Sequence, residues 1–131
     1  KILMEHNLIK SKGRVVILSS IWELLTRQDK FAYTVTKAAV GGLVRSLAVD
    51  LGSAKGILVN GILPGIVDTP MSRGLLKPEQ IDAVINGTPT GRMLIPSDIG
   101  NAVYLLASEL NTAISGQSLL VDNGWSIARK I

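Results

Sequence analysis

Short apolar runs alternate along the chain with segments of helical periodicity. Residues 15–18 and 57–63 are largely apolar and rich in β-branched side chains, which is typical of strands buried on both faces of a parallel sheet. Between them, apolar positions recur at helical spacing from Phe31 to Leu51, and Gly52 is the expected C-cap. This order predicts a strand–helix–strand unit with a right-handed crossover.

The second half of the chain is divided by prolines. All five prolines lie between residues 64 and 96, where we expect a mobile lid or loop region that contains one short helix over residues 78–85. A longer helix should follow, with Ser97 as its N-cap and Asp98 at the positive end of its dipole. Residues 118–121 predict a third strand.

Composition excludes several classes of protein. The 131 residues fall within the single-domain range, and 47% of them are hydrophobic, which is enough for a real core. Lys and Arg are scattered, so the net charge of +4 predicts no nucleic-acid partner. The lack of cysteine excludes disulfides and thiolate metal sites and favours a cytoplasmic protein. The longest apolar stretches are too short to cross a bilayer, so we expect no membrane association.

The beginning of the sequence has no feature of a signal peptide. It starts with Lys1 rather than methionine, which is consistent with an internal cut. Residues 1–9 place apolar side chains mostly on one side of a helical wheel, and this predicts the end of an amphipathic helix. His6 has no nearby partner in the sequence, and we assign it no role.

A tyrosine and a lysine four residues apart are the first candidates for catalysis. On the expected helix, Tyr33 and Lys37 lie on one face in adjacent turns. An ammonium close to a phenol favours the phenolate, which prepares a tyrosine for acid/base work near neutral pH. The same spacing occurs on many surface helices where the pair has no chemistry, so its importance depends on the surrounding sequence.

Further motifs surround this pair in a recognisable order. Residues 13–20 form a strand that leads into a serine, Ser20, which stands thirteen positions before Tyr33, and residues 33–37 form a Tyr-x-x-x-Lys motif. A strand and a Pro-Gly turn follow at residues 58–65, and then Thr69 and the closing segments 88–99 and 116–124. Together they resemble the short-chain dehydrogenase/reductase family over essentially the whole chain. Leu63 and Asn123 are mild departures, because the family commonly has a small residue and a glycine there.

The resemblance implies an α/β fold, namely the second, incomplete half of a Rossmann-like doubly wound parallel sheet. Residues 1–131 would form the C-terminal, catalytic portion of a single domain. No glycine-rich phosphate loop follows any of the three expected strands, so the strands that hold adenosine are expected before Lys1 or on a companion chain. The asparagine that completes the family's proton relay would also lie upstream.

The resemblance also implies a role for each site residue. Ser20 would hydrogen-bond the substrate carbonyl or hydroxyl, Tyr33 would transfer the proton, and Lys37 would both assist Tyr33 and hold the nicotinamide ribose. The residues that would contact the cofactor, NAD or NADP, are Tyr33, Lys37, Pro64, Gly65, Val67 and Thr69. The implied activity is hydride transfer between a small-molecule alcohol and a carbonyl. The aspartates do not cluster as metal ligands would, so no metal is expected.

Several alternatives stay open at this level. The chain is either part of an active enzyme or a truncated or proteolysed non-catalytic remnant that binds no cofactor. A protein-binding scaffold has no support beyond an apolar helix face. Trp22 borders the substrate cleft or is a half-buried packing residue, and Met71 belongs to the segment where the family has its substrate lid or packs in the core.

Assembly is a further expectation. The helix from Phe31 carries small residues that would let another helix approach closely: Ala38, Ala39, Gly41 and Gly42. The resemblance implies that this helix pairs across a twofold axis, so we expect a homodimer or a homotetramer.

Overall fold

A parallel sheet of three strands forms the centre of the computed structural model, which describes residue 6 and residues 9–128. β1 (Arg14–Leu18) pairs with β2 (Leu58–Pro64), and β2 pairs with β3 (Ser118–Val121). The three strands expected from the sequence are confirmed to within one residue at each end. The helix expected over residues 1–9 lies almost entirely outside the described residues.

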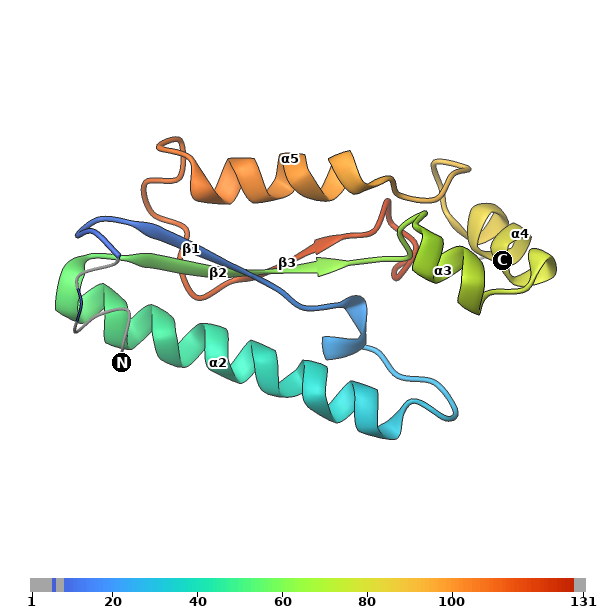
Figure 1. The fold of residues 1–131 in the computed structure, drawn as a ribbon, viewed down its shortest axis with the longest axis horizontal. Coiled ribbons are helices and arrows are strands. Elements are labelled where there is room, and N and C mark those ends of the chain that lie inside the picture. The colour runs from blue at the N-terminus through green and yellow to red at the C-terminus, as the bar shows by residue number, and fades with distance from the viewer. Residues whose placement is uncertain (1–5, 7–8, 129–131) are drawn as a thin grey trace.

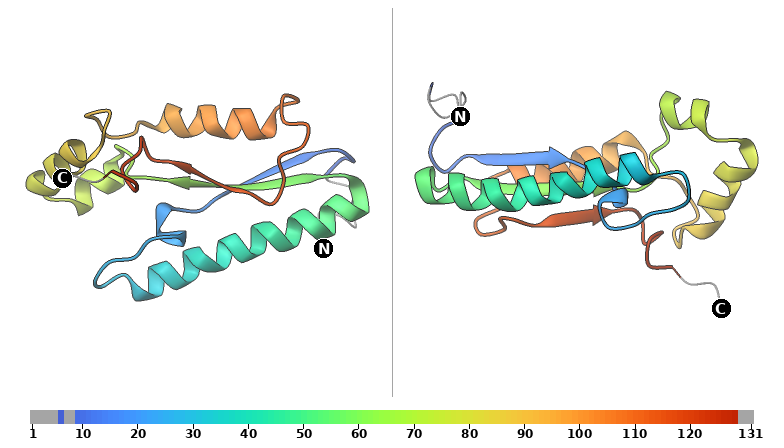
Figure 2. Two further views of the ribbon diagram at one scale, coloured as in Figure 1. Left: turned by 180° about the vertical axis from the view of Figure 1, so that it is seen from behind. Right: turned by 90° about the horizontal axis from the view of Figure 1, so that it is seen from below.

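Two helices cover the opposite faces of this sheet (Figures 1 and 2). α2 (Phe31–Lys55) packs against β2 from one side, and α5 (Pro96–Ala107) packs against all three strands from the other. Ile62 of β2 forms a buried cluster with Ala102 and Leu106 of α5. The neighbouring Gly61 faces α2, where a Cβ atom would lie 3.3 Å from the Cγ2 of Val44. Successive residues of β2 therefore face α5 and α2 in turn, so that one strand packs against both helical layers. The α/β fold is confirmed.

The C-terminus of α2 corrects the expectation that Gly52 is its cap. The helix continues to Lys55, and Gly56 adopts the left-handed conformation with φ of 64° while its N–H donates to the carbonyl of Gly52. Position Gly56 needs a positive φ, which glycine adopts without steric cost, whereas Gly52 stays helical. Either glycine satisfies the sequence pattern, and of the two only Gly56 has the positive φ of a cap.

The segment between β2 and α5 is more ordered than the expected loop region. It contains two helices, α3 (Pro70–Leu75) and α4 (Pro78–Gly87), which lie beyond the carboxyl ends of the strands (Figure 1). Each begins with a proline, whose fixed φ suits the first helical turn. α3 was missed because six residues are too few to show helical periodicity, and α4 extends two residues beyond the expected helix.

The N-terminus of α5 corrects the assignment of Ser97 as its cap. The helix begins at Pro96, and a carboxylate oxygen of Asp98 accepts the Ile95 N–H over 2.9 Å. Arg92 also hydrogen-bonds this carboxylate. These contacts, with the Arg92 side chain the larger cause, hold the pKa of Asp98 below its usual value. Asp98 at the start of this helix is therefore confirmed, with a role as the capping side chain.

A tight turn follows β3. The Asp122 carboxylate accepts the N–H groups of Gly124 and Ser126 over 3.0 and 2.8 Å. Asn123 has a positive φ of 55°, which explains how it replaces the glycine that the family commonly has there, because asparagine tolerates the left-handed region better than most residues. Within the described residues, no helix combines the length and the apolar character needed to span a bilayer.

Candidate active site

Ser20 lies where β1 has just ended. It is buried and forms the N-cap of the short 3-10 helix η1 (Ile21–Glu23), where its hydroxyl oxygen accepts the Trp22 N–H over 3.4 Å. Ser19 instead donates to the main-chain carbonyl of Lys37 over 3.5 Å. The two adjacent serines therefore separate in function: Ser19 ties the end of β1 to α2, and Ser20 presents its hydroxyl at the carboxyl edge of the sheet.

Tyr33 and Lys37 lie in the first turns of α2, as the sequence predicts. The Nζ of Lys37 is 5.6 Å from the centroid of the Tyr33 ring, and the Nζ of Lys30 is 5.7 Å from it. The Tyr33 side chain is 43% exposed, so its hydroxyl is accessible to a ligand. Both ammonium groups therefore lie within cation–π range of the Tyr33 ring.

Gly65 follows the last residue of β2, Pro64, and passes very close to β3. A Cβ atom on Gly65 would lie 2.8 Å from the Cβ and 3.0 Å from the Cα of Asp122. The Gly65 N–H donates to the carbonyl of Val121 over 2.9 Å, which holds the two chains together. Glycine is therefore required here for packing, in addition to the cofactor contact that the resemblance implies.

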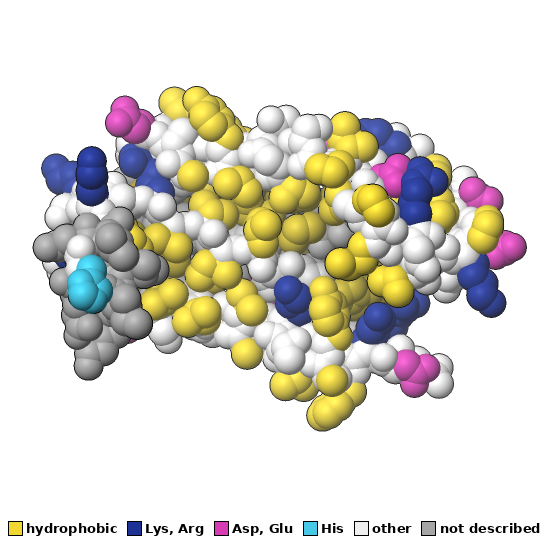
Figure 3. All heavy atoms as spheres, in the orientation of Figure 1, with side chains coloured by type: hydrophobic (Ala, Val, Ile, Leu, Met, Phe, Trp, Pro, Cys, Tyr) yellow, Lys and Arg dark blue, Asp and Glu magenta, His cyan; other side chains and the backbone are white. Residues whose placement is uncertain are grey.

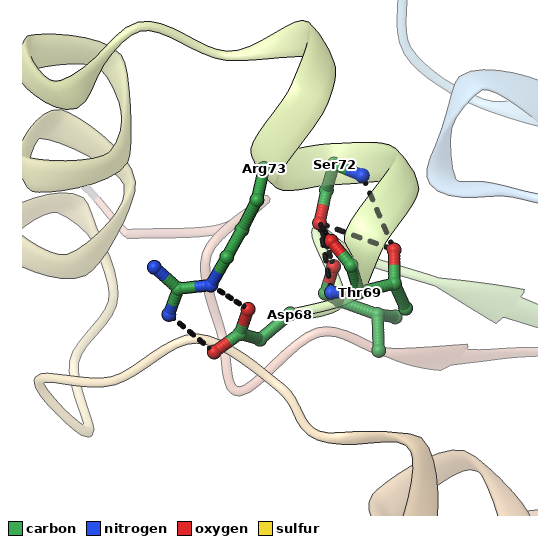
Figure 4. A network of polar contacts seen from close by, with 5 residues as sticks. Asp68, Thr69, Ser72 and Arg73 are labelled. Carbon is green, nitrogen blue, oxygen red and sulfur yellow. Dashed lines mark hydrogen bonds and ion pairs between the residues drawn. The ribbon is translucent and has the colours of Figure 1, made fainter.

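Thr69 begins α3 through a reciprocal capping arrangement (Figure 4). Its hydroxyl accepts the Ser72 N–H over 3.2 Å, and the Ser72 hydroxyl accepts the Thr69 N–H over 2.9 Å. The Ser72 hydroxyl also contacts the carbonyl of Val67 over 2.6 Å. Ser72, which the sequence did not single out, thus fixes the segment that carries Val67 and Thr69.

A second contact holds the same segment. Arg73 of α3 forms a two-pronged ion pair with Asp68, as Figure 4 shows. The hydrogen bond from the guanidinium, with its charge as a further cause, keeps the pKa of Asp68 below its usual value. Asp68 is therefore neutralised locally and adds little negative field to the neighbouring residues.

A cleft of about 840 Å³ brings most of the predicted site residues together. Ser20 and Tyr33 line one side, and the segment with Gly65, Val67 and Thr69 lines the other. Pro64 and Lys37 are not among the residues that line the cleft. Lys37 lies next to it, with its Nζ 5.6 Å from the centroid of the Tyr33 ring. This volume lies within the range of pockets that hold small molecules and cofactors.

Aromatic and aliphatic side chains complete the cleft. Trp22 is half-buried and borders it, so both interpretations of this residue are compatible with the structure. Met71 is 75% exposed and also lines the cleft, which excludes a position in the core. Sequence reasoning missed Trp125 and the cations Arg27 and Lys30, which line the same cleft. Lys30 precedes Tyr33 by one helical turn, and that spacing is the signal that could have found it.

The described residues contain no group of three or more His, Cys, Asp or Glu side chains that could hold a metal ion. His6 is exposed.

Comparison with known proteins identifies the relatives of this chain. A family model described as enoyl-(acyl carrier protein) reductase matches residues 3–126. Glucose 1-dehydrogenase of Gluconobacter oxydans is 35% identical over 117 residues, which cover 88% of this chain and 44% of that protein. The chain spans about half the length of the curated relatives it matches.

Solved structures share the fold. A short chain dehydrogenase family protein from Francisella tularensis matches 97% of the chain with a TM-score of 0.86 and 26% identity, over 56% of its own length. A gluconate 5-dehydrogenase from Burkholderia cenocepacia in complex with NADP and tartrate matches 89% with a TM-score of 0.81 and 30% identity, over 46% of its length. A 7α-hydroxysteroid dehydrogenase with NADH and a 7-oxo bile acid matches 92% with a TM-score of 0.80 and 37% identity, also over 46%.

Proposed function

The chain belongs to the short-chain dehydrogenase/reductase family, and from this premise we propose that it forms the catalytic half of an NAD(P)-dependent oxidoreductase that interconverts an alcohol and a carbonyl. One observation carries the proposal: Ser20 and Tyr33 line the same cleft although they come from different elements, and the Lys37 ammonium lies 5.6 Å from the Tyr33 ring. A proton donor, a hydrogen-bonding hydroxyl and a cation are thus within one site.

The chemistry of the protein side follows from these positions. The Tyr33 hydroxyl gives a proton to the carbonyl oxygen during reduction and takes it back during oxidation. Ser20 donates a hydrogen bond to the same oxygen and so orients it towards Tyr33. The positive charge of Lys37 stabilises the phenolate that remains after proton transfer. The cleft therefore supplies the acid/base half of the reaction.

The cofactor side of the cleft is the segment from Pro64 to Thr69. Val67 borders the cleft, and among the described residues its N–H has no hydrogen-bond acceptor, whereas its carbonyl is occupied by Ser72. That free N–H and the Thr69 hydroxyl fit the carboxamide of a nicotinamide, and Gly65 leaves room beside it. When bound, the nicotinamide supplies or accepts the hydride. NAD and NADP are equally compatible with these residues.

We call the complete enzyme this chain together with the segment or companion chain that provides the first half of the sheet. β1 is an edge strand of the described sheet, so its outer side is available for that pairing. The alternative is a non-catalytic remnant that keeps the fold without cofactor. We place the enzyme in the cytoplasm, with a small-molecule alcohol or carbonyl as substrate.

We further propose that the complete enzyme is a homodimer or homotetramer. Support comes from α2, which exposes a row of apolar side chains along the described part of the chain: Phe31, Val35, Leu43 and Val49. Of the small residues expected to admit another helix, Gly41 is instead buried against Glu23, and a Cβ atom at Gly42 would meet open space. The exposed apolar residues, more than the glycines, favour burial against a second copy.

Replacing the proton donor tests the proposed function. Tyr33→Phe in the complete enzyme removes the hydroxyl and should lower turnover about 10²- to 10⁴-fold while the fold survives. Tyr104→Phe is the matched control, because Tyr104 is exposed on α5 outside the residues that line the cleft. Turnover is followed by nicotinamide absorbance and folding by circular dichroism. Near-normal turnover of the Tyr33 variant would reject the proposal.

A further inference from the structure

Two cations line the catalytic cleft without a carboxylate to balance them. Arg27 and Lys30 are lining residues, whereas no aspartate or glutamate lines the cleft. Asp29 lies between them in sequence, but its backbone is in the left-handed region and it is not a lining residue. Of the acidic residues next to lining residues, Asp68 is paired with Arg73, and the Asp122 carboxylate accepts the N–H groups of Gly124 and Ser126. The cleft therefore carries net positive charge.

Neither cation has an ion-pair partner among the described residues. Each lies over an aromatic ring instead: the Arg27 guanidinium carbon is 5.8 Å from the Trp22 centroid, and the Lys30 Nζ is 5.7 Å from the Tyr33 centroid. The rings hold the two charges beside the cleft without neutralising them. Dark blue Lys and Arg side chains lie beside hydrophobic ones on the face between α3 and the beginning of α2 (Figure 3).

The local backbone adds to the same field. Lys30 occupies the N-cap position of α2, which has no side-chain cap and no acidic residue in its first turn. The positive end of the dipole of this 25-residue helix therefore lies at Lys30 with no side-chain cap. An anion bound in the cleft would be attracted by the charge of each cation.

We propose that the cleft takes a substrate with an anionic oxyacid group, a carboxylate or a phosphate, bound by Arg27 and Lys30, and with an apolar body that bears the alcohol or carbonyl. The inference rests on the proposed function for the reacting end. The apolar body fits the remaining lining, which includes Trp22, Met71, Leu75, Leu76 and Trp125. The anionic group stays chemically unchanged, and its role is to align the reacting carbon with Ser20 and Tyr33.

Binding of matched neutral and anionic ligands tests this inference without relying on turnover. Benzoate, phenyl phosphate and benzamide share an aromatic body, and calorimetry on the complete enzyme compares their affinities. Benzoate or phenyl phosphate should bind about tenfold or more tightly than benzamide. The anion that binds more tightly shows whether the site prefers a carboxylate or a phosphate. Equal affinity for all three ligands, or no binding of any of them, overturns the inference.

Charge-removing variants locate the binding site. Arg27→Gln and Lys30→Gln should each weaken the preferred anion about three- to fivefold and leave benzamide unchanged. Arg45→Gln is the matched control, because Arg45 is exposed on α2 outside the cleft lining and its replacement should change neither ligand. Unchanged anion affinity in both cleft variants rejects the assignment.

The same proteins separate this inference from the proposed function. Tyr33→Phe should lose turnover and keep its preference for the anion. If the Tyr33→Phe variant stays active and still prefers the anion, the proposed function is rejected and the anion site is retained.

Discussion

The carboxylate of Glu23 accepts a hydrogen bond from the Ser118 hydroxyl over 2.7 Å and thereby joins two elements that are 95 residues apart. Glu23 belongs to η1, directly after Ser20, and Ser118 begins β3. The second carboxylate oxygen is buried and has no partner among the described residues. Gly41 of α2 makes room for this side chain, since a Cβ atom there would lie 2.8 Å from the Glu23 Cδ. The support of the Ser20 loop thus depends on Glu23 and Gly41 together.

Gly41→Ala should therefore destabilise the complete enzyme by about 1–3 kcal/mol, because the new methyl group displaces the Glu23 carboxylate, which then loses its hydrogen bond to Ser118. Gly42→Ala is an unusually close control, because a Cβ atom at Gly42 meets nothing within 4 Å and alanine favours the helix by up to about 1 kcal/mol. Unfolding by denaturant measures both effects. The free energy of unfolding should fall in Gly41→Ala and rise in Gly42→Ala. If Gly41→Ala is as stable as Gly42→Ala, the close packing around Glu23 is wrong.

The pairing of Glu23 with Gly41 shows where prediction from sequence ends. The strands at residues 14–18 and 58–64 were predictable because both are mostly apolar and β-branched, as is usual in a parallel sheet covered by helices. The Glu23 contact depends on the distance between η1 and α2, which no local pattern encodes. The same limit explains the error at Gly52 and the missed Arg27, whose importance depends on tertiary position, whereas the spacing of Lys30 to Tyr33 was a signal in the sequence.

Gly65→Ala should destabilise the complete enzyme by about 1–3 kcal/mol and reduce cofactor affinity. The added methyl group would press on the Asp122 backbone, 3.0 Å from its Cα, and a main chain cannot swing away as a flexible side chain does. Gly74→Ala in α3 is the control, since a Cβ atom there also meets nothing within 4 Å. Thermal unfolding and cofactor titration measure the two effects. A Gly65 variant with the stability of the Gly74 variant would contradict the close approach of β2 to β3.

Asp122 should make the stability of the complete enzyme depend on acidic pH. Burial opposes ionisation of its carboxyl and is the largest single influence, but the hydrogen bonds from Ser126 and Gly124 together outweigh it, so its pKa lies below the usual value. A lowered folded-state pKa contributes stability that is fully present above the unfolded value of about 3.9 and is lost as the pH falls through the folded value.

Comparison with Asp122→Asn measures this contribution. At pH 7 the variant should be less stable by about 1–3 kcal/mol, because one charge-assisted acceptor is lost. The difference should shrink as the pH falls below about 4, where the native carboxyl also becomes protonated. A difference that is constant between pH 7 and pH 3 would show that the ionised carboxylate has no special role in the turn.

Residues 1–131 alone should not bind NAD or NADP measurably. None of β1, β2 and β3 is followed by a glycine-rich turn, which is the feature that normally holds the pyrophosphate together with a helix N-terminus. The contacts proposed for Val67 and Thr69 would reach only the nicotinamide end. Calorimetric titration of both dinucleotides into the purified chain, with its mass confirmed, checks this. Micromolar binding would mean that the second half of the fold holds more of the cofactor than we infer.

Lys37→Ala should reduce both turnover and cofactor affinity in the complete enzyme. The Lys37 ammonium lies 5.6 Å from the centroid of the Tyr33 ring, and in the proposed mechanism Lys37 assists proton transfer by Tyr33 and holds the nicotinamide ribose. We expect turnover at saturating cofactor to fall on the order of 10- to 100-fold, while the cofactor Kd rises. Lys10→Ala serves as the control, because Lys10 is an exposed lysine before β1.

The measurement separates the two roles of Lys37, because saturation with cofactor removes the affinity defect and leaves the effect on proton transfer. A variant that recovers full turnover at saturating cofactor would show that Lys37 binds the ribose without assisting Tyr33.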